Sequence, residues 1–478
     1  MIDNFIEKDI LRRVKITYVL YECRQIKIGE LAANMNTSFN TIKKDCQKIA
    51  SKLEDEIVSY DISRSQLSFQ FKPDVCCYDL VRKLYSDSLF LKVCYRCLLG
   101  KNNYTSIAEE EFISVTKVFN LKKKAERYFR QGLGLAPTGK IAFDDKLKVR
   151  YIYLTLWMRG IGVNELKNDL LFLKSERIAQ DLGELLKNRL SKKSLHYLQY
   201  AIFLSIRRKE TLPIDSEMIE FLKTGIIFNS VKTCFLQHGL EVDDANIAFV
   251  SFIYKNLPYN PENYRLIEMD YQYYRNRLIK NYPSVVQLIR NFEAAFDMTL
   301  LGEIEFEKPL MDLVYTTSLG LNEFLLNQYY FIDCNDYSIK EKISRIIRAW
   351  LKENISANIT MSESIILQFC HLVMPLLKKG EKKKVPIIIV SKDEYSHMLF
   401  RNNIRKIISE NYFFINDEIY YSMDDIPELF YNINCFIVCE RCLMNQEKNF
   451  ILPISINNLT HDLKDISNYI FTCVLTKQ

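Results

Sequence analysis

Amide, hydroxyl and ammonium side chains gather near the N-terminus, in a stretch whose apolar residues recur at helical spacing. Amides and hydroxyls can bond to base edges, and ammonium groups attract phosphates, so this set suits contact with the major groove of double-stranded DNA. The candidate contacts in this stretch are Ser38, Phe39, Asn40, Thr41, Lys43, Lys44 and Gln47. Their chemistry requires a helix that presents several of them on one face.

A helix-turn-helix would position these side chains. Ala32 is small where the two helices would cross, and Asn36 tolerates the left-handed backbone that such a turn needs. Ile42 would pack inward, and the hydroxyl of Ser38 can cap the second helix. Asp45 would lie on the far face of that helix, away from the groove.

Two runs of alternating apolar and polar residues follow, in the stretch I-V-S-Y-D-I-S-R-S-Q-L-S-F-Q-F. They flank Ser63, Arg64 and Ser65, and this pattern predicts a β-hairpin with a basic tip. Such a hairpin is the wing of a winged helix, so Arg64 joins the candidate DNA contacts.

A second copy of the pattern lies further along the chain. The intervals from Ala108 to Ser114 and from Ser114 to Val118 are six and four residues, the same as those that separate Ala32, Ser38 and Ile42. Its candidate contacts are Ser114, Thr116, Lys117, Asn120, Lys123, Lys124 and Arg127, with Lys122 and Arg130 as further charges. Residues 132–143 are rich in glycine and predict a second wing. For either copy, the alternative is an ordinary helical hairpin with a solvated basic face.

Charge separates the N-terminal third from the rest. Residues 1–160 hold 28 Lys and Arg against 19 Asp and Glu, whereas the remaining residues hold 37 against 40. A basic segment on a slightly acidic body is typical of a nucleic-acid-binding head, because phosphate neutralisation supplies most of the non-specific affinity.

The rest of the chain predicts mostly helix, since its 478 residues include only 13 Gly and 11 Pro. From about residue 167 to 379 long amphipathic patterns indicate helical bundles. After the charged run at 378–384, the order strand, helix, strand, strand, helix predicts a small α/β domain with a mostly parallel sheet. No apolar run reaches the ~18 residues of a membrane span, and we expect a cytoplasmic protein with reduced thiols.

Taken together, these segments resemble the Mga and AtxA virulence regulators of Gram-positive bacteria. The segment L-A-A-N-M-N-T-S-F-N-T-I-K-K-D, the run K-V-R-Y-I-Y-L-T-L-W after the second copy, and the order of domains carry the resemblance. It implies a mainly α, multi-domain fold with tandem winged helix-turn-helix heads. The implied domains are head 1 at 1–72, head 2 at 73–163, bundles regulated by the sugar phosphotransferase system at 164–280 and 281–379, and an enzyme IIB-like α/β domain at 383–478.

The same resemblance implies that histidines of the bundles are phosphorylated. His196, in L-H-Y-L-Q-Y-A-I, suits the earlier of the two family positions, and His371, in S-E-S-I-I-L-Q-F-C-H-L, suits the later one. Ile253 and Leu313 fall near the other two positions, so each bundle keeps one histidine of two. The alternative for both is a partly buried structural imidazole.

The sequence carries no sign of catalysis. An active IIB domain uses a cysteine thiolate after its first strand, but here Ser391 follows Val390. Cys94 and Cys97, like Cys439 and Cys442, have metal-ligand spacing, but the two pairs lie in different predicted domains. Cys94 and Cys97 also fall one turn apart on an apolar helix, which favours a buried core pair over a zinc site. We predict no enzyme activity, no catalytic residue, no metal and no cofactor.

The predicted function is therefore that of a DNA-binding transcriptional regulator, an activator controlled by histidine phosphorylation. The expected partners are double-stranded DNA, the phosphocarrier protein of the phosphotransferase system, RNA polymerase, and a second copy bound through the C-terminal domain, with no membrane contact. An RNA-binding antiterminator and a phosphocarrier protein are the alternative functions.

Overall fold

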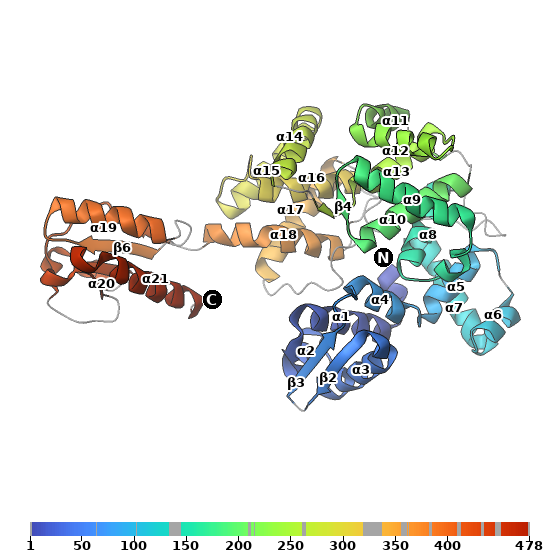
Figure 1. The fold of residues 1–478 in the computed structure, drawn as a ribbon, viewed down its shortest axis with the longest axis horizontal. Helices are drawn as coiled ribbons and strands as arrows, with labels where there is room; N and C mark the ends of the chain where they lie inside the picture. The colour runs from blue at the N-terminus through green and yellow to red at the C-terminus, as the bar shows by residue number, and fades with distance from the viewer. Residues whose placement is uncertain are drawn as a thin grey trace. The chain divides into compact units, whose positions relative to one another are not determined.

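The structure is a computed structural model of the whole chain (Figure 1). It describes residues 2–63, 65–101, 103–132, 145–208, 212–214, 216–260, 264–318, 337–354, 361, 363–381, 385–408, 413–431, 435–444 and 451–476. The chain forms two compact units, one of residues 1–289 and 307–371 and one of residues 290–306 and 372–478. The fold is mainly helical with a small parallel sheet near the C-terminus, as the sequence predicts.

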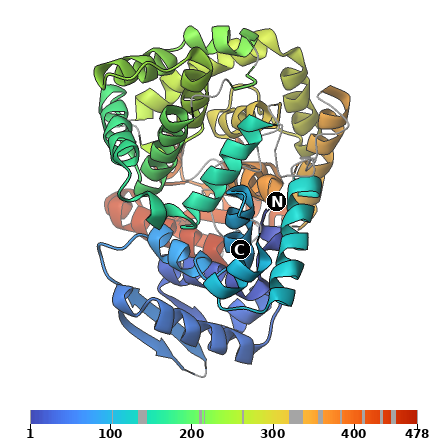
Figure 2. The same cartoon turned by 90° about the vertical axis from the view of Figure 1, so that its right-hand side faces the viewer.

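The first seventy residues combine three helices with a small antiparallel sheet (Figures 1 and 2, blue). The elements are α1 (Lys8–Cys23), β1 (Gln25–Lys27), α2 (Ile28–Asn34), α3 (Phe39–Lys52), β2 (Ile57–Ile62) and β3 (Gln66–Phe71). The strand order is β1-β3-β2, and Ile62 pairs with Leu67 at the end of the β2–β3 hairpin. The predicted helix pair and hairpin are therefore present.

A second group of helices follows. Its elements are α4 (Cys77–Tyr85), α5 (Leu89–Leu98), α6 (Tyr104–Glu110), α7 (Val115–Arg127), a π-helical turn (Tyr128–Gly132) and α8 (Lys146–Met158). Most of the predicted second wing, residues 133–143, lies outside the described residues.

Long helices fill the middle of the chain. They are α9 (Leu170–Leu185), α10 (Lys192–Arg207), α11 (Ser216–Lys223), α12 (Ile226–Gln237) and α13 (Asp244–Lys255), with the short strands β4 (Arg189–Leu190) and β5 (Tyr259–Asn260). One hydrophobic cluster extends through the described residues from Ile2 to Leu257, so α1 to α13 share a core.

Five further helices complete the predicted bundle region. They are α14 (Tyr264–Asn281), α15 (Pro283–Phe296), α16 (Ile304–Ser318), α17 (Tyr337–Asn354) and α18 (Glu363–Glu381). A buried carboxylate joins the first and third of them, because Glu307 accepts hydrogen bonds from Tyr271 at 2.7 Å and from Arg275 at 2.6 Å. The aromatic ring of Trp350 likewise ties α17 to α15, by donating to the carbonyl of Ser284 at 2.7 Å.

The C-terminal unit contains a four-stranded parallel sheet in the order β7-β6-β8-β9. Its elements are β6 (Val385–Val390), α19 (Glu394–Ile407), β7 (Phe413–Ile415), α20 (Glu428–Tyr431), β8 (Phe436–Glu440), β9 (Ile451–Ile454) and α21 (Leu459–Thr476). Side chains of α19 and α21 pack on one face, whereas Tyr420, Met423 and Ile426 pack on the other. The fourth strand, β9, is absent from the sequence-based prediction.

No helix among the described residues is both long and apolar enough to cross a membrane.

Candidate nucleic-acid interface

The first helix pair has the local geometry that its sequence predicts. The turn between α2 and α3 contains Asn36, whose φ of +48° lies in the left-handed region. The hydroxyl of Ser38 accepts the N–H of Thr41 at 3.3 Å, which confirms the predicted cap. A short turn with fixed dihedrals sets the angle between the helices, and hence the direction in which α3 faces.

Helix α3 exposes one polar face. Ile42, Cys46 and Ile49 are buried together on one side, so the side chains about half a turn away point to solvent. Exposed on that opposite face are Asn40, Lys44, Gln47 and Ser51. Three predicted DNA contacts, two amides and an ammonium group, therefore share one surface.

The other predicted residues of this pair are less prominent. Phe39 is exposed at the start of α3, whereas Thr41 and Lys43 are partly buried. The hydroxyl of Thr41 lies 2.8 Å from that of Ser38, which links two of the candidates to each other. Arg64 lies outside the described residues.

A buried ion pair anchors α3 to α1. The carboxylate of Asp45 is 3% exposed and accepts a hydrogen bond from the guanidinium of Arg12. Asp45 thus lies away from the exposed face, as predicted, and its charge is balanced inside the protein.

The second pair repeats this geometry with different side chains. Phe112 occupies the turn between α6 and α7 at φ +53°, the position that Asn36 holds in the first pair. The hydroxyl of Ser114 accepts the N–H of Lys117 at 3.2 Å, so Ser114 caps α7 as Ser38 caps α3. Local signals in the sequence thus position both helix pairs in the same way.

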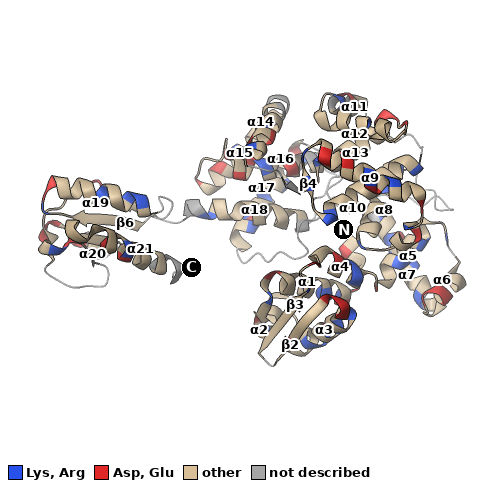
Figure 3. Ribbon diagram, viewed as in Figure 1, with Lys and Arg blue, Asp and Glu red and all other residues tan. Residues whose placement is uncertain are grey.

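The exposed face of α7 is more basic than that of α3. Val118 and Ala125 are buried, and the side chains on the opposite side are Thr116, Asn120, Lys123 and Arg127. Thr116 lies 76 residues after Asn40, and the other three follow Lys44, Gln47 and Ser51 at the same interval. Lys117 is also exposed, next to this face. Figure 3 shows the Lys and Arg residues on α3 and α7 in blue.

Two lysines of α7 differ from the expectation. Lys122 is 6% exposed, and its ammonium group lies 4.2 Å from the ring centroid of Tyr104. Lys124 is partly buried, with its ammonium group 5.5 Å from the ring centroid of Phe90. Lys122 follows Val118 by four residues, so it shares the inward side of the helix. It is not part of the exposed face.

The first of the two predicted phosphorylation residues, His196, lies among aromatic and basic side chains. It lies half-buried near the start of α10, and its Nδ1 atom is 3.3 Å from the hydroxyl of Tyr78 and 3.5 Å from a guanidinium nitrogen of Arg82. The ring stacks on that of Tyr200 with the centroids 5.8 Å apart. Lys192, at the first position of α10, pairs with Asp79 at 2.8 Å.

The surroundings keep His196 neutral. Burial, followed by the positive charges of Arg82 and Lys192, lowers the pKa of His196 to about 4, and the carboxylate of Asp79 offsets only part of this. Its Nε2 atom has no hydrogen-bond partner among the described residues. A neutral imidazole with a free nitrogen can act as a nucleophile, and the nearby cations would stabilise a negative group attached to it.

His371 has a different position. It lies on α18, the last residue of the larger unit, and its side chain is exposed.

The C-terminal unit offers weaker chemistry. Ser391 follows β6, as predicted, and its buried hydroxyl has no hydrogen-bond partner among the described residues. Lys392 pairs with Glu440 at 3.1 Å, and the same carboxylate accepts the N–H of Lys392 at 2.9 Å. A carboxylate at the carboxyl end of the sheet disfavours an anion there.

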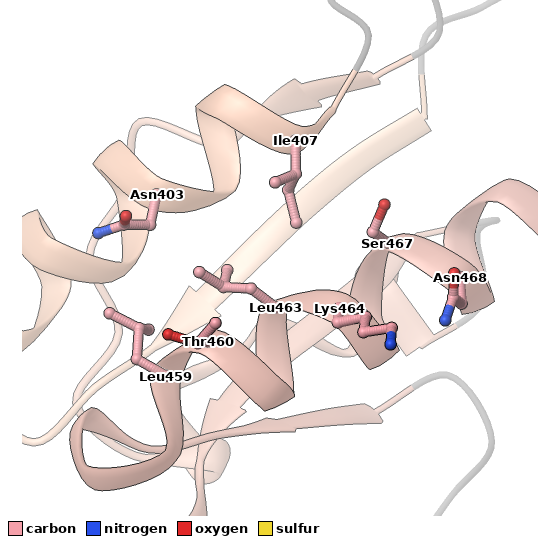
Figure 4. Close-up of a pocket in the computed structure, with 8 residues that line it drawn as sticks. All are labelled: Asn403, Ile407, Leu459, Thr460, Leu463, Lys464, Ser467 and Asn468. Carbon is pink, nitrogen blue, oxygen red and sulfur yellow. The ribbon is translucent and has the colours of Figure 1, made fainter.

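An open groove of about 390 Å³ runs between α19 and α21 (Figure 4). Apolar side chains of both helices, Ile407, Leu459 and Leu463, line it together with amides, hydroxyls and Lys464. It has neither a carboxylate nor an imidazole among these lining residues. We assign no chemistry to it.

Reasoning from sequence missed the residues around His196. Tyr78 and Arg82 precede it by 118 and 114 residues, and neither belongs to a motif. No local pattern connects an arginine of one short helix with a histidine so far along the chain.

Cys94 and Cys97 are buried, and burial raises the pKa of the Cys97 thiol to about 11. Both read as core residues, since thiolates would be needed to bind zinc. A comparison of the chain with models of known protein families gave no match, and a comparison with curated protein sequences gave none either.

Proposed function

We propose that the chain is a DNA-binding transcriptional regulator, an activator similar to Mga and AtxA, that contacts the major groove with α3 and α7. The observation that carries this proposal is the repetition of one geometry at an interval of 76 residues. Each copy has a left-handed turn residue, a serine cap and an exposed polar face on its second helix. An ordinary helical hairpin needs none of these features twice.

The two faces suit different parts of a duplex. Asn40 and Gln47 carry amides, which pair with adenine edges in the major groove. Lys123 and Arg127 carry cations, which suit phosphates and guanine edges. In this proposal head 1 supplies more of the base readout and head 2 more of the non-specific affinity.

Phosphorylation of His196 would regulate the protein. A phosphohistidine carrier approaches Nε2, its N–P bond breaks as the bond to Nε2 forms, and the proton that His196 gives up passes to the carrier imidazole. The tautomer that donates from Nδ1 to the oxygen of Tyr78 leaves the lone pair on Nε2. We keep His371 as a second acceptor, on the basis of the resemblance alone.

The remaining parts of the proposal also rest on the resemblance. The C-terminal unit would bind a second copy of the chain, and a dimer would bring four helix pairs to one long DNA site. RNA polymerase would be the partner that an activator recruits.

Fluorescence anisotropy of the full-length protein on a duplex of about 40 base pairs, across a salt series, tests DNA binding. Binding should weaken with salt, with a slope of about −0.9 for each phosphate contact. The double variant Lys123→Ala with Arg127→Ala should reduce the magnitude of the slope by about 2. Arg177→Ala removes an exposed cation from α9 and serves as the matched control.

An unchanged slope in the double variant would contradict the assignment of α7. Adding an RNA hairpin as competitor to the protein–DNA complex distinguishes the two nucleic acids. A regulator of transcription initiation should stay bound to the DNA duplex in the presence of the RNA. Loss of the duplex to RNA would favour an antiterminator.

A further inference from the structure

Helix α4 lies between His196 and the first helix pair. The helix spans Cys77–Tyr85. It contacts α1 and α3 on one side and the start of α10 on the other. It belongs to neither exposed DNA face. A short helix with two functional neighbours can transmit a displacement from one to the other.

The side of α4 that faces α10 carries polar contacts. One guanidinium nitrogen of Arg82 lies 3.5 Å from Nδ1 of His196, and another donates to the hydroxyl of Tyr200 at 3.3 Å. The guanidinium carbon lies 5.2 Å from the ring centroid of Tyr78. The Nε atom of Arg82 is buried and has no hydrogen-bond partner among the described residues. The Nε–H group of Arg82 is therefore available to donate a further hydrogen bond.

The side of α4 that faces the first head is apolar, with ion pairs at its margins. Leu80 and Leu84 are buried in the shared core. Lys83 pairs with Glu56, which immediately precedes β2. Just beyond α4, Asp87 pairs with Lys52, the last residue of α3, at 2.6 Å. A movement of α4 would therefore act on both ends of the segment that follows the recognition helix.

A phosphoryl group on Nε2 would change the balance of charge around Arg82. It adds nearly two negative charges near a guanidinium that donates to the neutral hydroxyl of Tyr200 and has the carboxylate of Asp79 as a nearby opposite charge. A bidentate bond to phosphate is stronger than the bonds that Arg82 makes to neutral groups. The guanidinium would exchange its bond to the hydroxyl of Tyr200 for bonds to the phosphoryl oxygens.

We propose that Arg82 is the positioning residue that senses a phosphoryl group on His196, and that α4 passes the change to the first head. This inference rests on the proposed function, because it requires both DNA binding and phosphorylation of His196. Reorienting α3 would alter how the two heads fit one duplex, and so change affinity without any contact between DNA and the histidine.

The test uses the full-length protein with phosphoramidate, a small phosphoryl donor. Its P–N bond breaks as the phosphoryl group bonds to the imidazole, and its amino group takes the proton from the imidazole and leaves as ammonia. Label at His196 is located by mass spectrometry and by comparison with His196→Gln, and duplex affinity is measured by anisotropy before and after treatment. In the wild type, we expect phosphorylation to change affinity by about fivefold or more. Arg82→Gln should take the label at His196 but show no change in affinity.

Two variants separate sensing from a merely structural role. Arg82→Lys keeps the charge but loses the planar fork, so it should retain part of the affinity change. Arg177→Gln, an exposed arginine of α9, should respond as the wild type does. Hydrogen exchange adds a readout that does not depend on variants, since the amides of α3 and α4 should change protection when the wild type is phosphorylated.

The outcomes can be told apart. A full affinity change in Arg82→Gln, or unchanged protection in α4 of the phosphorylated wild type, overturns the role of Arg82 and α4 while the proposed function stands. A wild type that binds DNA and takes the label without any affinity change overturns the inference together with regulation through His196. Absence of DNA binding, or of label at His196, overturns the proposed function itself.

Discussion

The half-buried imidazole of His196 makes the free energy of unfolding depend on pH. Its surroundings lower its pKa to about 4 from 6.5, so the unfolded chain binds the proton more readily than the folded one. The contribution is complete above pH 6.5 and is lost as the pH falls toward 4. The difference of about 2.5 between the two pKa values corresponds to about 3 kcal/mol of pH-dependent stability from this residue in that window. Urea unfolding of wild type and His196→Gln at several pH values should show the difference, and parallel curves would contradict it.

Another single residue, Arg150, holds three helices together from inside the core. The side chain is 1% exposed, and it donates to the amide oxygen of Asn246 at 2.5 Å and to the carbonyl of Arg208 at 2.9 Å. Replacing it with alanine leaves those oxygens buried without their donor, so Arg150→Ala should cost about 3 kcal/mol or more. Denaturant midpoints of the larger unit measure the loss. The exposed Arg177→Ala should stay within about 0.5 kcal/mol of the wild type.

Single residues also show where sequence reasoning succeeds. The caps at Ser38 and Ser114 and the turn at Asn36 are predictable, because each depends on neighbours within four positions. The burial of Lys122 had a signal too, in its spacing from Val118 and Ala125. Arg82 had none, since its partner His196 is 114 residues away.

At the scale of elements, the turns of the two helix pairs have the same backbone conformation but differ in conformational strain energy. Phe112 holds φ +53° with 94% of its side chain exposed, and a bulky residue in this region is strained by about 1 kcal/mol or more. Phe112→Asn should therefore stabilise the larger unit by about 0.5 to 1 kcal/mol. The reciprocal Asn36→Phe should destabilise it. Thermal unfolding measures the change in stability of each variant. Changes of the same sign in Phe112→Asn and Asn36→Phe would be inconsistent with strain in the turn.

The missed strand β9 illustrates a limit at this scale. Its sequence I-L-P-I contains Pro453, and a proline within an apolar run argues against a strand. The structure places β9 at the edge of the sheet, beside β8, where one side of the strand needs no partner. Edge position depends on strand order, which no local pattern reveals. Strand β6 also contains a proline, Pro386, but at its second position and before the unbroken run I-I-I-V, while β7 and β8 carry aromatic residues, so these three strands were predictable.

At the scale of the whole molecule, two heads on one chain should make affinity depend on duplex length. Once one head binds, the other is held near the same duplex at a high effective concentration. A duplex of about 15 base pairs leaves room for one head, whereas one of about 40 admits both. We expect the wild type to bind the longer duplex at least tenfold more tightly per site. Anisotropy at one salt concentration tests this, with Lys44→Ala and Gln47→Ala together as the variant that should lose the advantage.

Mainly helical composition, the position of the small parallel sheet and both helix pairs followed from the sequence, because each arises from local periodicity or from runs of apolar residues. The shared core of α1 to α13 did not, since it results from packing between segments far apart along the chain. The setting of His196 belongs to this second kind of information. A histidine can be singled out by its own helix, but its environment depends on which helix covers it.

The equal spacing of the two helix pairs has a consequence for how such a chain can acquire new targets. The buried residues and caps that define each pair are separate from the four outward side chains of α3 and of α7. If both helices bind DNA as proposed, selection can rewrite the outward residues of one helix while the other keeps the protein on DNA. A lineage could drift from one set of promoters to another through intermediates that remain bound throughout, without ever passing through an inactive ancestor.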